Sequence, residues 1–341
     1  MGKYHKAWDV SYKNFPLKGN VLEQIKFLLQ YAVLAPSTHN IQPWLFRVHD
    51  AACDFLFDPA AYLPYGDHEK RYGYISIGAA IENFYIACTA FRMEPKIVYL
   101  SDKMKTVRVE VQRSEGFDHV YSKKLEAIIN RVNVRGVFEK RSIEPAILTE
   151  FQNGSTDINR CSLHLCTTRK NIQKVAEMTA SGLRKAHGNT LFRQEVARHI
   201  ISNISKKPRG IPGYTMNLPL VPSLIVPKII FHKDISFVLA KLNFKSVMSA
   251  PLVCVVTTEN WEEESWIDAG RMAERTIIEG QLNGISSSIY VAATEFEDTA
   301  QKLQSVLNTE EKPLFLFCMG YMKKKNRKHS QRIPVFEKIV K

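Results

Sequence analysis

The chain has 341 residues, of which 45% are hydrophobic and 24% charged, and its formal net charge is +13. This length and composition allow a large core in one or two domains, and no apolar run approaches the ~20 residues of a membrane span. The segment 1–14 is basic but too polar for the apolar core of a signal peptide, so we expect a cytoplasmic protein with no membrane partner.

The spacing of the cysteines and the basic clusters limit which metals, compartments and binding partners the sequence predicts. The cysteines lack the Cys-x-x-Cys pairs of a zinc site, which predicts core or strand thiols, a reducing compartment and no metal. Basic residues gather at 206–209 and 323–332, where a solvated face is the usual explanation. No nucleic-acid-binding motif accompanies them, so we expect no specific nucleic-acid partner, while anionic phosphate ligands and weak nonspecific association stay open.

Residues 34–46 are the most informative stretch. Apolar residues recur at helical spacing over 21–33, and Trp44, Phe46 and Val48 alternate with their neighbours as in a half-buried strand. Between these elements, polar residues 37–42 are flanked by two prolines. Such a loop on rigid supports suits the polar edge of a flat ligand, although a helix stop followed by a turn explains the same residues.

The rest of the chain predicts alternating helices and strands. We expect helices over 76–91, 122–130, 171–185, 191–204, 266–283 and 297–307, and a short one begun by Ser142. Strands are expected over 97–100, 106–111, 163–166, 252–257 and 314–319. Five prolines should break any regular element over 205–228, and a lid or binding loop is one standard reason for such a segment.

An internal repeat links two of the predicted helices. Gly78, Glu82 and Ile86 recur as Gly270, Glu274 and Ile278, each displaced by 192 residues (270 − 78). Strand candidates follow both helices. The repeat therefore predicts a duplicated fold.

The residue pattern around the loop 34–46 resembles that of a known family. The chain resembles the nitroreductase family of FMN-dependent flavoproteins in this order of elements: a helix, then the motif Ala-Pro-Ser-x-x-Asn-x-Gln-Pro-Trp, then a strand. The resemblance implies an α+β fold, duplicated here, in which each half is a mainly antiparallel sheet flanked by helices. It also implies a flavin whose ring edge meets Pro36, Ser37, Thr38 and Asn40, with Gln42 in the same cofactor-binding motif.

The distribution of the family's signatures implies an unusual assembly. Ordinary members are homodimers that build each flavin site from an Arg-x-Ser-x-Arg/Lys segment of one subunit and the Pro-Ser loop of the other. Here each signature occurs once, and Gly154–Asp157 stands where a second loop would fall. The chain thus resembles the single-chain branch represented by the mycobacterial Acg protein. This implies a monomeric intramolecular pseudo-dimer with one complete flavin site, halves at 1–125 and 126–341, and a lid-like insertion at about 205–228.

The second signature supplies further expected cofactor contacts. By resemblance, Arg131 would reach the phosphate or ribityl chain, Asn133 stands where the family prefers serine, and Arg135 would approach the N1/C2-carbonyl edge. A cation at that edge would stabilise an anionic reduced flavin. Without the family, Arg131 and Arg135 at a helix exit are equally explained as solvated side chains.

Two C-terminal segments complete the expected site. Arg332 matches the family's phosphate arginine, and Ser330 occupies a lysine position of some members, which would shift phosphate binding toward Arg327 or Lys328. Ser287 and Ser288 match a segment whose backbone N–H faces flavin N5, although a polar turn explains them as well. His39 is interpreted as a ring-edge donor, a substrate contact or an exposed loop histidine.

Two functions remain open at this point. In the first, NADPH or NADH binds transiently and reduces FMN, and a small acceptor such as a nitroaromatic or a quinone takes the electrons. In the second, a lid over the flavin makes the protein a catalytically silent FMN-binding or sequestering protein.

Overall fold

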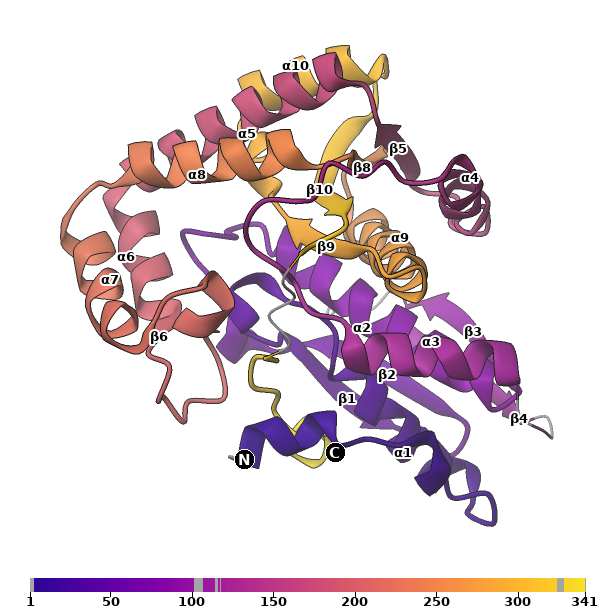
Figure 1. Ribbon diagram of the computed structural model, residues 1–341. Coiled ribbons are helices and arrows are strands. Elements are labelled where there is room, and N and C mark those ends of the chain that lie inside the picture. The colour runs from indigo at the N-terminus through magenta and orange to yellow at the C-terminus, as the bar shows by residue number, and fades with distance from the viewer. Residues whose placement is uncertain (1–2, 101–106, 114–115, 117, 324–327, 341) are drawn as a thin grey trace.

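The computed structural model describes residues 3–100, 107–113, 116, 118–323 and 328–340, and these form two main sheets with helices packed between and around them (Figure 1). The first sheet has the order β11-β1-β2-β4-β3. Its strands are antiparallel apart from the β1–β11 pair. They are β1 (Trp44–Val48), β2 (Ala52–Phe57), β3 (Met93–Tyr99), β4 (Val107–Arg113) and β11 (Ile339–Val340).

The second sheet has the order β5-β8-β10-β9 and is antiparallel throughout. Its central strands lie in the core, because every residue of β8 and all but the first of β10 are buried. The strands are β5 (Ser162–Cys166), β8 (Leu252–Thr258), β9 (Ser286–Ile289) and β10 (Lys312–Gly320). A short parallel pair, β6 (Ile200–Ile201) and β7 (Ile211–Pro212), stands apart.

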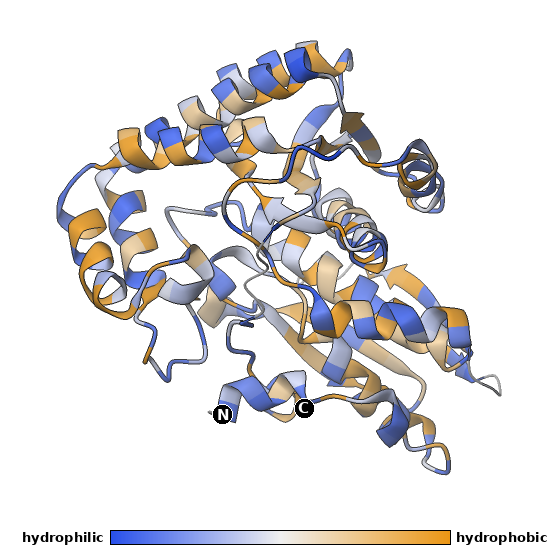
Figure 2. Cartoon of the chain, in the orientation of Figure 1, coloured by the Kyte–Doolittle hydropathy of each residue, from blue (hydrophilic) through white to orange (hydrophobic). Residues whose placement is uncertain are grey.

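The helices cover these sheets, with apolar residues on the faces that meet the core (Figure 2). Asn20 and Glu23 form a capping box that fixes the start of α1. The α-helices are α1 (Val21–Ala32), α2 (Arg71–Ala90), α3 (His119–Asn130), α4 (Pro145–Asn153), α5 (Arg169–Gly188), α6 (Thr190–His199), α7 (Leu220–His232), α8 (Ser236–Ser249), α9 (Glu263–Leu282) and α10 (Glu297–Leu307).

Helices α2 and α9 cross at the centre of the molecule through the two repeated glycines. A Cβ on Gly78 would overlap the carbonyl oxygen of Ile267, and a Cβ on Gly270 would overlap that of Ile75. The two contacts are related by the same displacement of 192 residues (267 − 75), so each helix contributes the same surface to the crossing. Close approach of backbones requires residues without a Cβ at these points.

The expected α+β class with mainly antiparallel sheets is confirmed, and the expectation for 205–228 is wrong in part. Helix α7 begins at Leu220 and continues through Pro222 and Pro227. Pro222 lies in the first turn, where an N–H would lack an intrahelical partner anyway. The expected helix 191–204 ends at His199, and strand β6 begins at Ile200. Thr106, the first residue of the expected strand 106–111, lies outside the described residues.

Sequence periodicity missed β2, β9 and α8. The division into halves at 125 and 126 stays a prediction, but it falls within α3, and β11 from the C-terminal end joins the sheet of the first half. The cysteines are free thiols, all buried except half-buried Cys161, as the scattered spacing predicts. In the described part of the chain, no helix is both long and apolar enough to cross a membrane.

Candidate functional site

A cavity of about 700 Å³ lies where the loop after α1 meets α2, α9, residues 131–137 and the C-terminal residues 322–323 and 328–332. Its volume falls in the range of about 300–1,000 Å³ that is typical of small-molecule and cofactor sites. Side chains of Ile75, Ala79, Ala273 and Ile277 supply apolar walls from the two crossing helices. The helix crossing therefore forms one side of the cavity.

The predicted loop lies at this cavity, with Pro36, Ser37, Thr38, His39 and Asn40 on its lining. A short 3-10 turn, η3 (Thr38–Asn40), carries it, and the backbone φ of His39 and Asn40 is +50° and +56°. Such left-handed conformations are costly for residues with a side chain and persist only where the surroundings impose them.

Gln42 supplies that constraint and does not line the cavity. Its side-chain oxygen accepts from Ile333 N at 2.7 Å, its side-chain nitrogen donates to Pro208 O at 2.8 Å, and its backbone N–H donates to Ser37 Oγ at 2.9 Å. Gln42 is fully buried behind the loop. The geometry thus gives it a positioning role where the sequence predicted a cofactor contact.

Two buried arginines meet at one end of the cavity. Arg131 Nη2 and Arg332 Nη2 both donate to Leu34 O, at 2.9 and 3.2 Å, and Arg332 Nη1 donates to Asn40 Oδ1 at 2.7 Å. Each arginine is only 3% exposed, so the solvated alternative for Arg131 is wrong. Burial and then the charge of Arg131 lower the pKa of Arg332 to about 9, which still leaves it cationic at neutral pH.

Glu274 is the acidic partner of this pair. Its Oε1 lies 3.2 Å from Arg131 Nε, and both side chains are buried. Burial raises the pKa of Glu274, and Arg131 opposes that shift. Among the described lining residues Glu274 is the sole acidic side chain, against the cationic side chains of Arg131, Arg135, Lys323, Lys328 and Arg332. The cavity therefore has excess positive charge.

The segment after α3 is held by strand β9. Val134 N donates to Ser287 O at 2.9 Å, and Ser288 Oγ donates to Val134 O at 2.7 Å. The side-chain oxygen of Asn133 accepts from Ile289 N at 3.2 Å, and Arg135 Nη1 donates to Ile289 O at 2.8 Å.

Asn133 and Arg135 line the cavity as expected, whereas Ser287 and Ser288 are buried and absent from the described lining. The two serines hold the arginine-bearing segment in place, and a cofactor contact from their backbone stays a prediction. Arg327 lies outside the described residues, so its expected phosphate contact stays a prediction too.

The sequence did not predict Trp8, Glu274 and His329 as lining residues. Trp8 stacks on His329 with ring centroids 3.9 Å apart, and both line the cavity. The ring centroids of His39 and His199 are 5.5 Å apart. Burial lowers the pKa of His39 to about 3, so the imidazole of His39 is neutral at physiological pH. Trp8, Glu274 and His329 come from distant parts of the chain, and no local motif marks them.

Unpaired polar atoms at the cavity indicate what kind of ligand it fits. Within the described chain, Arg332 Nε and His39 Nδ1 are buried without a hydrogen-bond partner, and both residues line the cavity. Together with the excess positive charge and the apolar helix walls, these groups fit a ligand that joins an anionic group to a flat ring.

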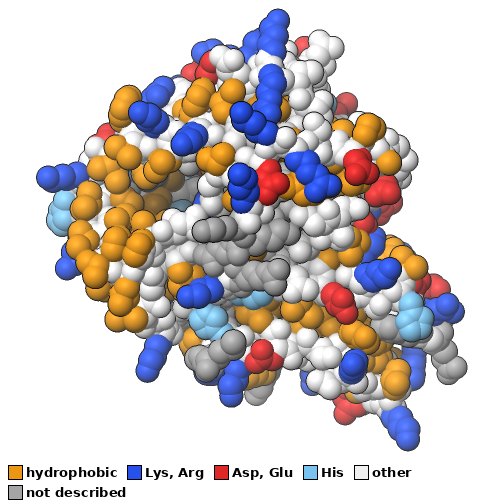
Figure 3. All heavy atoms as spheres, viewed as in Figure 1, with side chains coloured by type: hydrophobic (Ala, Val, Ile, Leu, Met, Phe, Trp, Pro, Cys, Tyr) orange, Lys and Arg blue, Asp and Glu red, His pale blue; other side chains and the backbone are white. Residues whose placement is uncertain are grey.

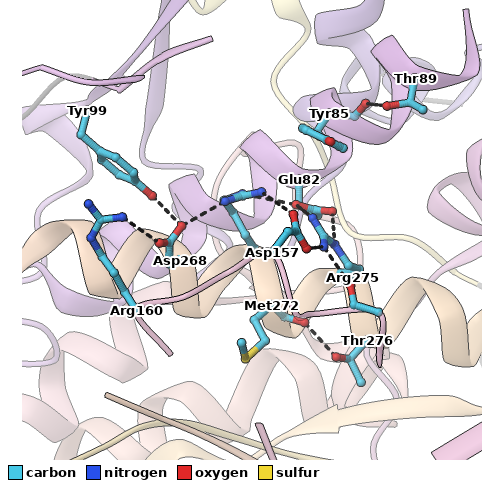
Figure 4. Close-up of polar contacts among 12 residues, drawn as sticks. Glu82, Tyr85, Thr89, Tyr99, Asp157, Arg160, Asp268, Met272, Arg275 and Thr276 are labelled. Atoms are coloured by element: carbon cyan, nitrogen blue, oxygen red, sulfur yellow. Dashed lines mark hydrogen bonds and ion pairs between the residues drawn. The ribbon is translucent and has the colours of Figure 1, made fainter. Parts of the chain in front are cut away.

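The position related by the internal repeat is filled by side chains (Figure 4). A shift of 192 residues maps Asn83 and Glu274 onto Arg275 and Glu82. Arg275 binds Glu82 through Nε at 2.6 Å and Nη2 at 3.2 Å, and its Nη1 binds Gly154 O at 2.8 Å and also Asp157. Residues 154–157, where a second Pro-Ser loop would fall, thus pack on a closed ion cluster.

Comparison with known proteins gives distant structural likenesses. No protein-family model matches the chain, and no curated protein sequence does. The chain is similar to an FMN- and NADPH-dependent nitroreductase, NfnB, from Sphigopyxis sp. strain HMH, with 15% identity, a TM-score of 0.43, and coverage of 63% of this chain and 96% of that one.

Two further solved structures are similar at the same level. Nitroreductase A from Vibrio parahaemolyticus has 12% identity, a TM-score of 0.39, and coverage of 63% of this chain and 72% of that one. An NADPH:FMN oxidoreductase from Vibrio harveyi, complexed with NAD+, has 11% identity, a TM-score of 0.36, and coverage of 59% and 70%. At these values the likeness says nothing of the activity of this chain.

Proposed function

We propose that the cavity binds FMN and that the protein is a nitroreductase-like oxidoreductase, which takes electrons from NADPH or NADH and passes them to a small acceptor such as a nitroaromatic or a quinone. The observation that carries the proposal is the buried pair Arg131 and Arg332, next to an apolar wall, with the carboxylate of Glu274 bound to Arg131. The excess charge suits a phosphate, and the wall suits a flavin ring.

The protein's own residues would divide the work of binding. Arg131 and Arg332 would hold the phosphate and the chain next to it, and the Pro36–Asn40 loop would bind the polar edge of the ring. The amide of Asn40 is already used, because its nitrogen donates to Gly210 O and Gln331 O and its oxygen accepts from Arg332. A ligand contact from Asn40 would therefore use its backbone. When bound, FMN would supply the hydride chemistry.

A second candidate is a catalytically silent FMN-binding protein whose lid is closed. Residues 211–212 and 215–217 line the cavity. Asn217 Nδ2 donates to Arg135 O at 2.9 Å, Tyr214 Oη donates to His329 O at 2.9 Å, and the Pro208 and Gly210 carbonyls accept from the Pro-Ser loop. These hydrogen bonds connect residues 208–217 to both sides of the cavity, which supports the interpretation of this segment as a lid.

The internal repeat also supports a proposed assembly. The reciprocal contact of α2 and α9 and the ion cluster on the related side support our proposal of a single-chain pseudo-dimer with one site. We place its halves at about 1–125 and 126–341 and expect a monomer.

An absorbance spectrum separates the candidates. The purified protein, after incubation with FMN and removal of the excess, should show a flavin band that bleaches on anaerobic addition of NADPH or NADH. A band that persists with both nucleotides but bleaches with dithionite would support the silent protein. No retained flavin would contradict both.

A further inference from the structure

Helices α7 and α8 carry an apolar surface that nothing in the described chain covers. Figure 3 shows hydrophobic side chains gathered on the left of the molecule, where Figure 1 places α7, and Figure 2 shows the same helix as largely hydrophobic. Val221, Phe237 and Leu242 are 62%, 71% and 59% exposed. The α7–α8 patch consists of Leu220, Val221, Leu224, Ile225, Ile229, Phe237, Val238 and Leu242.

The patch is the outer face of a helix whose inner face is already packed. On the inner side, buried Ile230 of α7 packs with Val196, Ala197 and Ile200 in a small separate core. Apolar residues on the outer side therefore add nothing to that core. A contiguous exposed patch of this kind on a monomer usually marks an interaction site.

The segment that carries the patch is strongly cationic. Between residues 202 and 249, Asp234 is the only acidic residue. The exposed lysines of this segment form no ion pair with any other described residue, which leaves their charges available to a partner. They are Lys206, Lys207, Lys228, Lys233, Lys241 and Lys245.

This charge distribution selects the kind of partner. In a symmetric dimer the same patch would face itself, and the lysines of two copies would be brought together in a low-dielectric interface. An anionic bilayer surface instead accepts apolar side chains below its headgroups and lysines at its phosphates. We propose that the α7–α8 patch docks the protein peripherally on an anionic phospholipid membrane.

Docking of this kind needs no membrane-spanning helix and does not depend on the proposed flavin. The α7–α8 patch lies close to the cavity in the chain. The 3-10 helix η5 (Gly213–Met216) comes shortly before α7 and contributes Thr215 and Met216 to the cavity lining. Vesicle binding and flavin binding can therefore be measured separately on the same full-length protein.

Co-sedimentation with vesicles tests the proposal. The protein should pellet with equimolar phosphatidylcholine and phosphatidylglycerol and stay in solution with phosphatidylcholine alone. Raising the salt to about 1 M, where the Debye length falls to about 3 Å, should release most of it. No pelleting with the anionic vesicles, or equal pelleting with both, would overturn the proposal.

Matched variants locate the contact. Lys228→Gln and Lys241→Gln should each weaken binding about fivefold, the effect of ~1 kcal/mol per lysine near an anionic surface, whereas Lys96→Gln on β3 should have none. Val221→Ser should weaken binding about tenfold, whereas Val120→Ser, 70% exposed on α3, should not. Equal effects of patch and control variants, or a dimer in sedimentation equilibrium that Val221→Ser dissociates, would contradict membrane docking.

Discussion

At the scale of single residues, the cavity holds two buried guanidinium groups for one buried carboxylate. Arg131 and Arg332 converge on the carbonyl of Leu34, and Glu274 forms an ion pair with Arg131. Burying an uncompensated cation costs free energy, because the interior replaces its water poorly. An anion that enters the cavity repays this cost, so ligand binding should raise the stability of the folded protein.

Arg131 and Glu274 should change FMN affinity in opposite directions. Arg131→Ala removes a cation and should raise the dissociation constant for FMN by about 10–100-fold, the range for a charge-assisted hydrogen bond. Glu274→Gln removes the competing carboxylate and should lower that constant. Quenching of FMN fluorescence on titration with each variant measures both. Weaker binding by both variants would indicate a general loss of structure, and unchanged binding by Arg131→Ala would remove Arg131 from the site.

Glu295 should make stability depend on pH. It lines a second cavity with Asp67 and Arg71, and burial raises its pKa to about 7, partly opposed by Arg71. Between about pH 4.5 and 7 the folded protein then keeps a proton that the unfolded chain releases, so the free energy of unfolding falls as pH rises. Burial also raises the pKa of Asp67, to about 6, which acts in the same direction.

Urea unfolding at pH 5 and pH 7 measures this effect. Glu295→Gln should reduce the difference between the two pH values by roughly 1–2 kcal/mol, and the remaining dependence would include Asp67. Substitution of exposed Glu259 by Gln serves as the control and should leave the difference unchanged. A pH dependence identical in the wild type and Glu295→Gln would show that Glu295 titrates normally.

At the scale of elements, strongly periodic segments were predictable and weakly patterned ones were not. Apolar spacing located α2, α9 and the buried strand β8, because each presents a regular face to the core. Strand β9 is four residues long and includes three serines, which the sequence also allows as a turn. Helix α8 has exposed apolar residues as well as buried ones, so its periodicity is blurred.

The α2–α9 crossing should not tolerate a side chain at its glycines. Gly78→Ala places a methyl group against the backbone of Ile267, so the helices must separate, and we expect a loss of about 2 kcal/mol or more in the free energy of unfolding. Gly188, at the end of α5, has open space around its Cα, and Gly188→Ala should be neutral or slightly stabilising. Denaturant unfolding compares the two. Equal stability of both variants would contradict the tight crossing.

At the scale of the whole molecule, the candidate site combines what a local motif can show with what only folding brings together. The loop 36–40 and Arg131 were predictable because uncommon residues stand close together in the sequence. Glu274 was visible as part of a repeat, but its pairing with Arg131 joins residues far apart in the chain. Gln42 belongs to the motif and still faces away from the cavity, since a sequence pattern does not give side-chain direction.

From this asymmetry we predict one FMN per chain. A symmetric duplication would give two equivalent sites, but on the related side Arg271 and Arg275 both form ion pairs with Glu82 and Asp157. An anion entering there would have to compete with the buried carboxylate of Glu82 for these arginines, and breaking a buried ion pair costs several kcal/mol. Titration of the protein with FMN, followed by measurement of bound flavin against protein concentration, should saturate at one equivalent, and Arg131→Ala should lower this occupancy. Saturation at two equivalents would mean that the ion cluster opens.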